Sequence, residues 1–113
     1  MADVVKMTPQ EEEMMIDNAY QNLLNGYLSS NHRKKVEIIE KAYKFAREAH
    51  KGVRRRSGEP YIMHPVAVAK ILLDYGMDNE CIIGALLHDV VEDTKYDLEY
   101  IRKNFGDDVA LLV

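Results

Sequence analysis

The sequence predicts an all-α domain, and three observations support this prediction. Apolar residues recur at intervals of three and four, as from Val36 to Ala46, which places them on one face of a helix. No stretch alternates convincingly between polar and apolar residues, the period of two that is typical of a half-buried strand. Residues that start or stop helices separate these segments, from Thr8 near the N-terminus to Gly106 near the C-terminus.

Two helices are predicted in the N-terminal half. Thr8-Pro9-Gln10-Glu11 combines a cap, a proline at the first helical position and a glutamate that can close a capping box. Apolar positions at helical spacing then continue to Tyr27, and Ser29-Ser30-Asn31 interrupts them. A second helix is expected from about His32 to His50, with Gly52 as its C-cap.

A loop from Val53 to Met63 precedes the third and fourth predicted helices. The third opens at His64-Pro65 and ends at Gly76. Asp78 caps the fourth, which is apolar on nearly every side from Cys81 to Leu87. A helix without a polar face is expected at the centre of its domain.

Two short helices complete the predicted fold. Asp97 caps the fifth, which stops at Gly106, and the sixth begins after Asp107-Asp108. The sequence ends within this last apolar segment, so we expect a piece of a longer protein with an uncovered apolar surface near its C-terminus. Such a surface could drive self-association.

Composition narrows the functional class. The 113 residues are 47% hydrophobic and 30% charged, as in one ordinary globular domain. The net charge of −4 argues against nucleic-acid binding, although six basic residues against one acid between Lys44 and Arg56 could hold an anionic ligand. The lone Cys81 excludes an intrachain disulfide and is interpreted as a packing residue. With no signal peptide and no run of membrane-spanning length, a cytoplasmic protein is expected.

Polar residues at the end of the fourth predicted helix are candidates for chemistry. His88 and Glu92 lie four residues apart, as do Asp89 and Asp93, so each pair shares a strip of one helical surface. His64, at the start of another helix, can supply a second imidazole. Such a set without thiolate suits Mn²⁺, Fe²⁺ or Zn²⁺, and with more oxygen ligands Mg²⁺. The alternative is a solvated helix terminus without a metal.

Longer motifs carry a resemblance to a known family. Their order and spacing run from Lys51-Gly52 through RRSGEPYIMHP (55–65) and GALLHDVVEDT (84–94) to Phe105-Gly106, Val109-Ala110 and Leu112-Val113. From about residue 36 onward the chain resembles the HD-type hydrolase domain of RelA/SpoT-family enzymes, the (p)ppGpp synthetases/hydrolases of the stringent response. The resemblance implies an all-α HD-domain helical bundle, truncated at its C-terminus, with residues 1–30 as an N-terminal helix and residues 31–113 as a partial hydrolase domain.

The resemblance also implies site residues. His64, His88 and Asp89 match three of the family's four metal ligands, for a metal that is typically Mn²⁺; the fourth, an aspartate, lies downstream of Val113. Glu92 and Asp93 match the acidic pair thought to position and activate the attacking water. The substrate-binding residues would be Arg55, against the guanine base, with Arg56 and Ser57 beside it. Arg56 is often a lysine in the family, a change that keeps the charge but alters hydrogen-bonding geometry.

The implied activity is metal-dependent hydrolysis of the 3′-diphosphate of (p)ppGpp to GDP or GTP and pyrophosphate. We expect the 113 residues alone to be inactive or nearly so, since one ligand and further nucleotide contacts are missing. The three remaining ligands are expected either to hold the metal weakly or to leave the site empty. One alternative is an HD phosphohydrolase of another nucleotide, and the loop from Arg55 to Tyr61 argues against it. Another is a non-catalytic nucleotide-sensing module, which would have no physical reason to keep four costly polar groups at residues 88, 89, 92 and 93. For Arg54-Arg55-Arg56 taken alone, a solvated surface turn remains the alternative.

Overall fold

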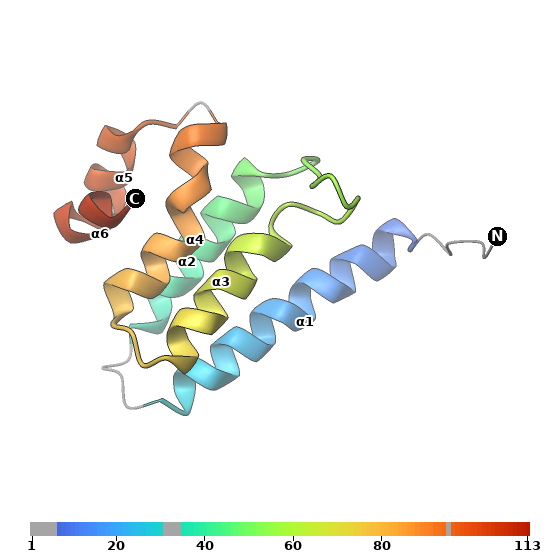
Figure 1. Cartoon of the computed structure of the whole chain (residues 1–113), viewed down its shortest axis with the longest axis horizontal. Helices are drawn as coiled ribbons and strands as arrows, with labels where there is room; N and C mark the ends of the chain where they lie inside the picture. Colours follow the sequence, from blue (N-terminus) through green and yellow to red (C-terminus); the bar gives the residue numbers. More distant parts are fainter. Residues whose placement is uncertain (1–6, 31–34, 95) are drawn as a thin grey trace.

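The fold is all-helical, as predicted. The computed structural model describes residues 7–30, 35–94 and 96–113, without the side chains of Glu92 and Asp93, and this part of the chain contains no strand. Figure 1 shows the helices as a bundle with the two shortest at one end. In chain order they are α1 (Pro9–Leu28), α2 (Val36–Ala49), α3 (Met63–Asp74), α4 (Asn79–Asp93), α5 (Leu98–Phe105) and α6 (Asp107–Leu112).

Side-chain caps begin three of these helices where the sequence predicts them. Thr8 accepts a hydrogen bond from the Glu11 amide and receives the Glu11 carboxylate at its own amide, which completes the predicted capping box. The Asp78 carboxylate accepts from the backbone N–H of residue 81, and that of Asp97 accepts from residue 100. These caps fix the starts of α1, α4 and α5.

Other boundaries differ by one or two residues from the prediction. The α2 helix ends at Ala49 with His50 as its cap residue, and its predicted start at His32 lies outside the described residues. The α6 helix begins at Asp107 rather than after Asp108, because Gly106, with φ of 98°, already turns the chain into the helix.

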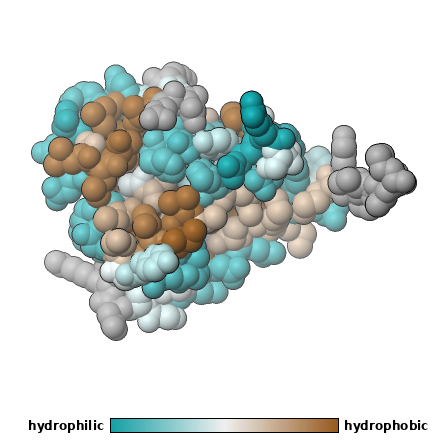
Figure 2. All heavy atoms as spheres, in the orientation of Figure 1, coloured by the Kyte–Doolittle hydropathy of each residue, from teal (hydrophilic) through white to brown (hydrophobic). Residues whose placement is uncertain are grey.

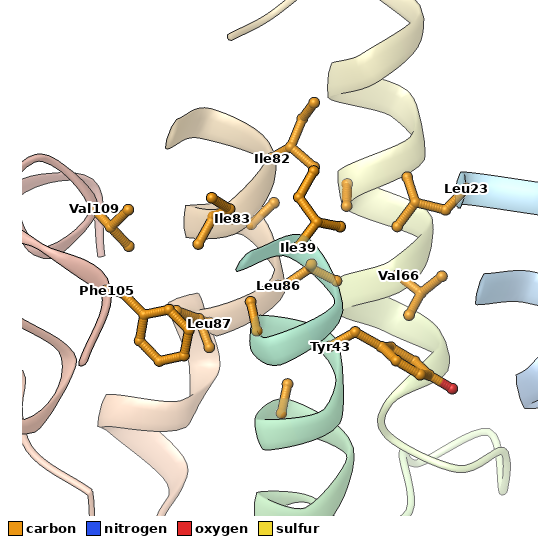
Figure 3. Packing of buried hydrophobic residues seen from close by; sticks show 14 of the residues in the cluster. Leu23, Ile39, Tyr43, Val66, Ile82, Ile83, Leu86, Leu87, Phe105 and Val109 are labelled. Atoms are coloured by element: carbon orange, nitrogen blue, oxygen red, sulfur yellow. The ribbon is translucent and has the colours of Figure 1, made fainter. Parts of the chain in front are cut away.

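The α4 helix lies at the centre of the core, as its apolar sequence predicts. Ile82 and Leu86 are fully buried and face α2, which contributes the fully buried Ile39 (Figure 3). On another side, the α4 residues Ile83 and Leu87 lie toward α5 and α6 (Figure 3). The α4 helix is therefore held by packing on two sides, toward α2 and toward α5 and α6.

Cys81 lies outside this buried cluster. Its side chain is half-buried in the first turn of α4, so it is not the core residue that the sequence suggests. Hydrogen bonding to the Asp78 carboxylate raises the pKa of the Cys81 thiol, with burial adding to the effect. A raised pKa disfavours the thiolate, which is the nucleophilic form.

The α1 helix packs against α3 and shares the same core. Leu23 and Tyr27 are fully buried, and the ring of Tyr20 stacks on that of Tyr43 in α2 with centroids 3.8 Å apart. Arg47 of α2 makes ion pairs with two carboxylates of α1, Glu13 and Asp17. Both apolar and ionic contacts thus attach α1 to the bundle.

Apolar residues remain exposed at the other end of the molecule. Figure 2 shows apolar atoms gathered over α5 and α6, and Leu111 and Leu112 are 81% and 53% exposed. Exposed leucines fit the expected apolar surface near the C-terminus, while self-association through it stays a prediction. None of the helices in the described ranges combines the length and hydropathy needed to cross a membrane.

Candidate metal centre and neighbouring loop

Three predicted metal ligands come together in the structure. His64 lies in the first turn of α3, and His88 and Asp89 lie near the end of α4, which packs against α3. Within the described part of the chain, they form one group whose ligand atoms all lie within 4.8 Å of one another. Nε2 of His88 is 3.1 Å from Oδ2 of Asp89, and Nε2 of His64 is 3.9 Å from the same oxygen.

A backbone hydrogen bond orients His88. Its Nδ1 lies 2.8 Å from the carbonyl oxygen of Ala85, one turn earlier in α4. Because a carbonyl oxygen only accepts, this contact places a proton on Nδ1, and in the neutral imidazole Nε2 is then the nitrogen with a lone pair for a metal. Nε2 is the nitrogen that faces Asp89. Metal-binding histidines are commonly held in this way by their second ring nitrogen.

Tyr61 orients Asp89, a contact that the sequence did not reveal. Its hydroxyl donates a hydrogen bond of 2.8 Å to Oδ2 of Asp89, across 28 positions of the chain. The Asp89 side chain is 13% exposed, so this bond satisfies a carboxylate largely removed from water. The only signal in the sequence was that Tyr61 stands three residues before His64.

The three side chains fit a divalent transition metal. Two imidazole nitrogens and one carboxylate oxygen suit Mn²⁺, Fe²⁺ or Zn²⁺. With metal–ligand bonds of roughly 2.1 Å, neighbouring donors are expected roughly 3 to 3.5 Å apart. The His88–Asp89 separation of 3.1 Å meets this expectation, and the His64–Asp89 separation of 3.9 Å is slightly wider. His64, His88 and Asp89 thus form a possible metal site.

The predicted substrate-binding residues lie on the loop between α2 and α3. The Arg55 amide donates to the Glu59 carbonyl at 2.9 Å, and the Gly58 amide donates to the Arg55 carbonyl at 2.8 Å, which folds the loop into a tight turn. Gly58 has a φ of 94°, a value that few residues with a side chain adopt. Arg56 and Ser57 are the residues between these hydrogen-bonded positions, and both are exposed.

A carboxylate draws two of these residues together. Oε1 of Glu59 is 3.5 Å from Nη1 of Arg55 and accepts a hydrogen bond of 3.1 Å from the hydroxyl of Ser57. Arg55 and Ser57 are exposed and the Glu59 side chain is 43% exposed, so these groups can exchange partners when a ligand arrives. The loop lies at the same end of the bundle as the C-terminal end of α4, as Figure 1 shows.

The predicted catalytic pair is placed only through its backbone. Glu92 and Asp93 belong to the last turn of α4, one turn beyond His88 and Asp89. Their side chains lie outside the described part of the structure. The helical spacing predicted from the sequence is therefore confirmed, and their catalytic role stays a prediction.

Comparisons with known proteins agree with this architecture. Residues 42–113 match the model of the HD domain family. A GTP pyrophosphokinase of Streptomyces coelicolor is 55% identical over 75 residues, which make up 66% of this chain and 9% of that protein. The match thus covers most of the chain and a small part of the relative.

Other relatives carry the name of a hydrolase. A guanosine-3′,5′-bis(diphosphate) 3′-pyrophosphohydrolase of Aquifex aeolicus is 50% identical over 86 residues, or 76% of this chain and 12% of that protein. The protein of the same name from Haemophilus influenzae is 54% identical over 68 residues, or 60% of this chain and 10% of that protein. The chain spans about a tenth of the length of the curated relatives it matches.

Proposed function

Because this chain belongs to the HD domain family and is similar to the hydrolase region of RelA/SpoT-type proteins, we propose that it is part of a (p)ppGpp 3′-pyrophosphohydrolase. The observation that carries the proposal is the gathering of His64, His88 and Asp89 within 4.8 Å in a chain about 50% identical to proteins of that name. In the proposed reaction, water and ppGpp give GDP and pyrophosphate. With pppGpp as the substrate, the nucleotide product is GTP.

His64, His88 and Asp89 would hold a divalent metal, for which we propose Mn²⁺. When bound, such an ion lowers the pKa of a coordinated water and neutralises charge on phosphoryl oxygens. The protein's own contribution is orientation. The Ala85 carbonyl presents Nε2 of His88, and the Tyr61 hydroxyl holds the Asp89 carboxylate.

The loop between α2 and α3 would bind the nucleotide. We propose that the Arg55 guanidinium lies against the guanine base, where a planar cation can stack on the purine. Arg56 and Ser57 would supply a positive charge and a hydroxyl to the neighbouring phosphates. The exposure of these three side chains and the weak Arg55–Glu59 contact of 3.5 Å support this role, because little holds Arg55 away from a ligand.

The acidic pair, Glu92 and Asp93, would accept the proton of the attacking water. A carboxylate of Glu92 or Asp93 would orient the attacking water and accept its proton as the water oxygen bonds to the phosphorus on the 3′ oxygen. The bond between that phosphorus and the 3′ oxygen then breaks, pyrophosphate leaves with the water oxygen, and the 3′ oxygen takes up a proton. The position of both residues one turn beyond the metal ligands in α4 supports this assignment.

A substrate comparison tests the proposal. Pyrophosphate release from ppGpp is measured with Mn²⁺, with dGTP as the competing substrate and His88→Ala as the control. Since the chain spans about a tenth of its relatives, the assay uses both the 113 residues and a hybrid in which they replace the matching residues of the Aquifex aeolicus relative. We expect that at least the hybrid releases pyrophosphate from ppGpp and that this release requires Mn²⁺ and His88. Turnover of dGTP alone, or ppGpp turnover unaffected by His88→Ala, would overturn it.

A further inference from the structure

One charged contact joins α1 to the loop that carries the proposed nucleotide-binding residues. Both oxygens of the Glu12 carboxylate accept hydrogen bonds from the Arg54 guanidinium, at 2.7 and 2.6 Å. The two residues stand 42 positions apart, Glu12 in the first turns of α1 and Arg54 next to Arg55. Figure 1 shows the loop beside the N-terminal half of α1.

The same guanidinium also holds the turn itself. Nη1 of Arg54 donates a hydrogen bond of 2.8 Å to the carbonyl oxygen of Gly58, at the far side of the turn. The backbone of Arg54 forms an isolated antiparallel bridge with Pro60. One arginine therefore links a carboxylate of α1 to both arms of the loop, and the segment between those arms contains Arg55, Arg56 and Ser57.

The environment of the pair favours a lasting contact. The Glu12 side chain is 19% exposed, and it borders a cavity of about 520 Å³ between α1, α2 and the loop. A two-pronged contact between guanidinium and carboxylate fixes geometry better than a single hydrogen bond. The hydrogen bond from the Arg54 guanidinium also holds the pKa of the Glu12 carboxyl below its usual value, which means that the contact favours the charged carboxylate.

We propose that Glu12 is a positioning residue for nucleotide binding, which acts through Arg54 to keep the Arg54–Gly58 turn in the conformation that presents Arg55. The α1 helix then takes part in substrate recognition although its residues precede the segment that matches the HD domain family model, residues 42–113. This inference rests on the proposed function, because it assigns the nucleotide to the same loop.

The test compares Glu12→Gln with Glu13→Gln. Glu13 is the adjacent residue of α1 and pairs with Arg47 instead, which keeps its second partner, Asp17, at 2.8 Å. Both substitutions remove one charge and one arginine contact from α1, but only Glu12→Gln touches the loop. Equal midpoints of thermal unfolding for the two variants would show that any difference in ppGpp binding does not come from a difference in overall stability.

Two readouts follow the loop and the ligand separately. Hydrogen exchange at the amides of Arg55, Gly58 and Tyr61, which are hydrogen-bonded within the loop, reports its order without any nucleotide. Titration of the hybrid protein with ppGpp in the presence of Mn²⁺ reports the affinity for the nucleotide. For Glu12→Gln we expect exchange about two- to fivefold faster and affinity lower by a similar factor, and no change for Glu13→Gln.

The outcomes separate this inference from the proposed function. Unchanged exchange in Glu12→Gln, or faster exchange with unchanged ppGpp affinity, overturns the positioning role while the unaltered chain still binds ppGpp. A second experiment compares Arg54→Gln with the double variant that combines Arg54→Gln and Glu12→Gln. If the double variant binds ppGpp no more weakly than Arg54→Gln alone, the two residues act together as proposed, and additive losses would contradict that. If the unaltered chain in the hybrid binds no ppGpp, both the proposed function and this inference fall.

Discussion

The hydroxyl of Tyr61 donates a hydrogen bond of 2.8 Å to Oδ2 of Asp89, the oxygen that also lies 3.1 Å from Nε2 of His88. This bond ties the loop between α2 and α3 to the end of α4, so the proposed nucleotide-binding segment and the possible metal site share one structural support. The ring of Tyr61 also lies 4.7 Å from that of His50, a histidine with only 3% exposure at the end of α2. Tyr61 is therefore fixed on its ring as well as at its hydroxyl.

Tyr61→Phe removes this hydroxyl and keeps the ring. We expect Mn²⁺ affinity to fall about 10- to 100-fold, the usual effect of losing a partner that orients a metal ligand. Isothermal titration of Mn²⁺ into the chain measures it. Tyr75→Phe is the matched control, because Tyr75 is 79% exposed and far along α3 from His64. An unchanged affinity in Tyr61→Phe would show that Asp89 needs no such support.

Arg55→Ala tests the nucleotide-binding role of the loop. Loss of a stacking guanidinium is expected to raise the KM for ppGpp about three- to thirtyfold, with kcat changed much less. Steady-state pyrophosphate release by the hybrid enzyme measures both constants. Lys103→Ala removes an exposed charge from α5 and serves as the control. A fall in kcat at constant KM would move Arg55 from binding to the chemical step.

Glu92→Gln tests the acidic pair. A carboxylate that accepts the proton of the attacking water is expected to contribute about 10² to 10⁴ to kcat, so the variant should lose activity by that factor and still bind Mn²⁺. Glu99→Gln, which alters an exposed carboxylate of α5, should leave activity unchanged. Loss of metal binding together with activity would instead make Glu92 a ligand.

Local chemistry explains why much of the fold could be predicted from the sequence. The side-chain caps at Thr8, Asp78 and Asp97 act within three residues of themselves, so their sequence motifs alone locate the starts of α1, α4 and α5. The stretch of α4 from residue 81 to residue 87, apolar on nearly every side, could be placed at the centre because a helix without a polar face is most stable when it is buried. His88 and Asp89 then follow at the end of the same helix.

Contacts between distant segments could not be predicted in the same way. The bonds Tyr61–Asp89 and Arg54–Glu12 span 28 and 42 positions, and nothing in the local sequence of one partner specifies the other. The basic triplet from Arg54 to Arg56 looks uniform in sequence. In the structure the Arg54 guanidinium is bound to Glu12 of α1 and to Gly58. Among the described residues the Arg55 guanidinium makes only a long contact with Glu59, a difference that depends on the packing of the loop against α1.

The stacked pair of Tyr20 and Tyr43 makes stability sensitive to alkali. Burial raises the pKa of Tyr20 to about 12, with the negative charges of Glu40 and Tyr43 adding to it. In the unfolded chain a tyrosine loses its proton near pH 10, so the folded state binds more protons above that pH and stability falls between about pH 10 and 12. The Tyr20 hydroxyl is buried without a hydrogen-bond partner among the described residues.

Tyr20→Phe should therefore weaken this alkaline loss of stability. It removes a buried, unsatisfied hydroxyl and keeps the stacked ring, so at neutral pH the free energy of unfolding should stay equal or rise by about 1 kcal/mol. Urea unfolding at about pH 9 and about pH 11 measures both effects. A part of the alkaline loss should remain, because burial also raises the pKa of Tyr43. The same pH dependence in Tyr20→Phe as in the unaltered chain would contradict the assignment.

The central claim is that His64, His88 and Asp89 bind one divalent metal ion, and titration of Mn²⁺ into the metal-free chain tests it most directly. We predict saturation at about one Mn²⁺ per chain, with binding lost in His88→Ala and kept in the control Glu99→Gln, whose exposed carboxylate in α5 lies outside the cluster. Circular dichroism would verify that each variant is folded. No Mn²⁺ binding by the unaltered folded chain, or equal binding by His88→Ala, would contradict the claim.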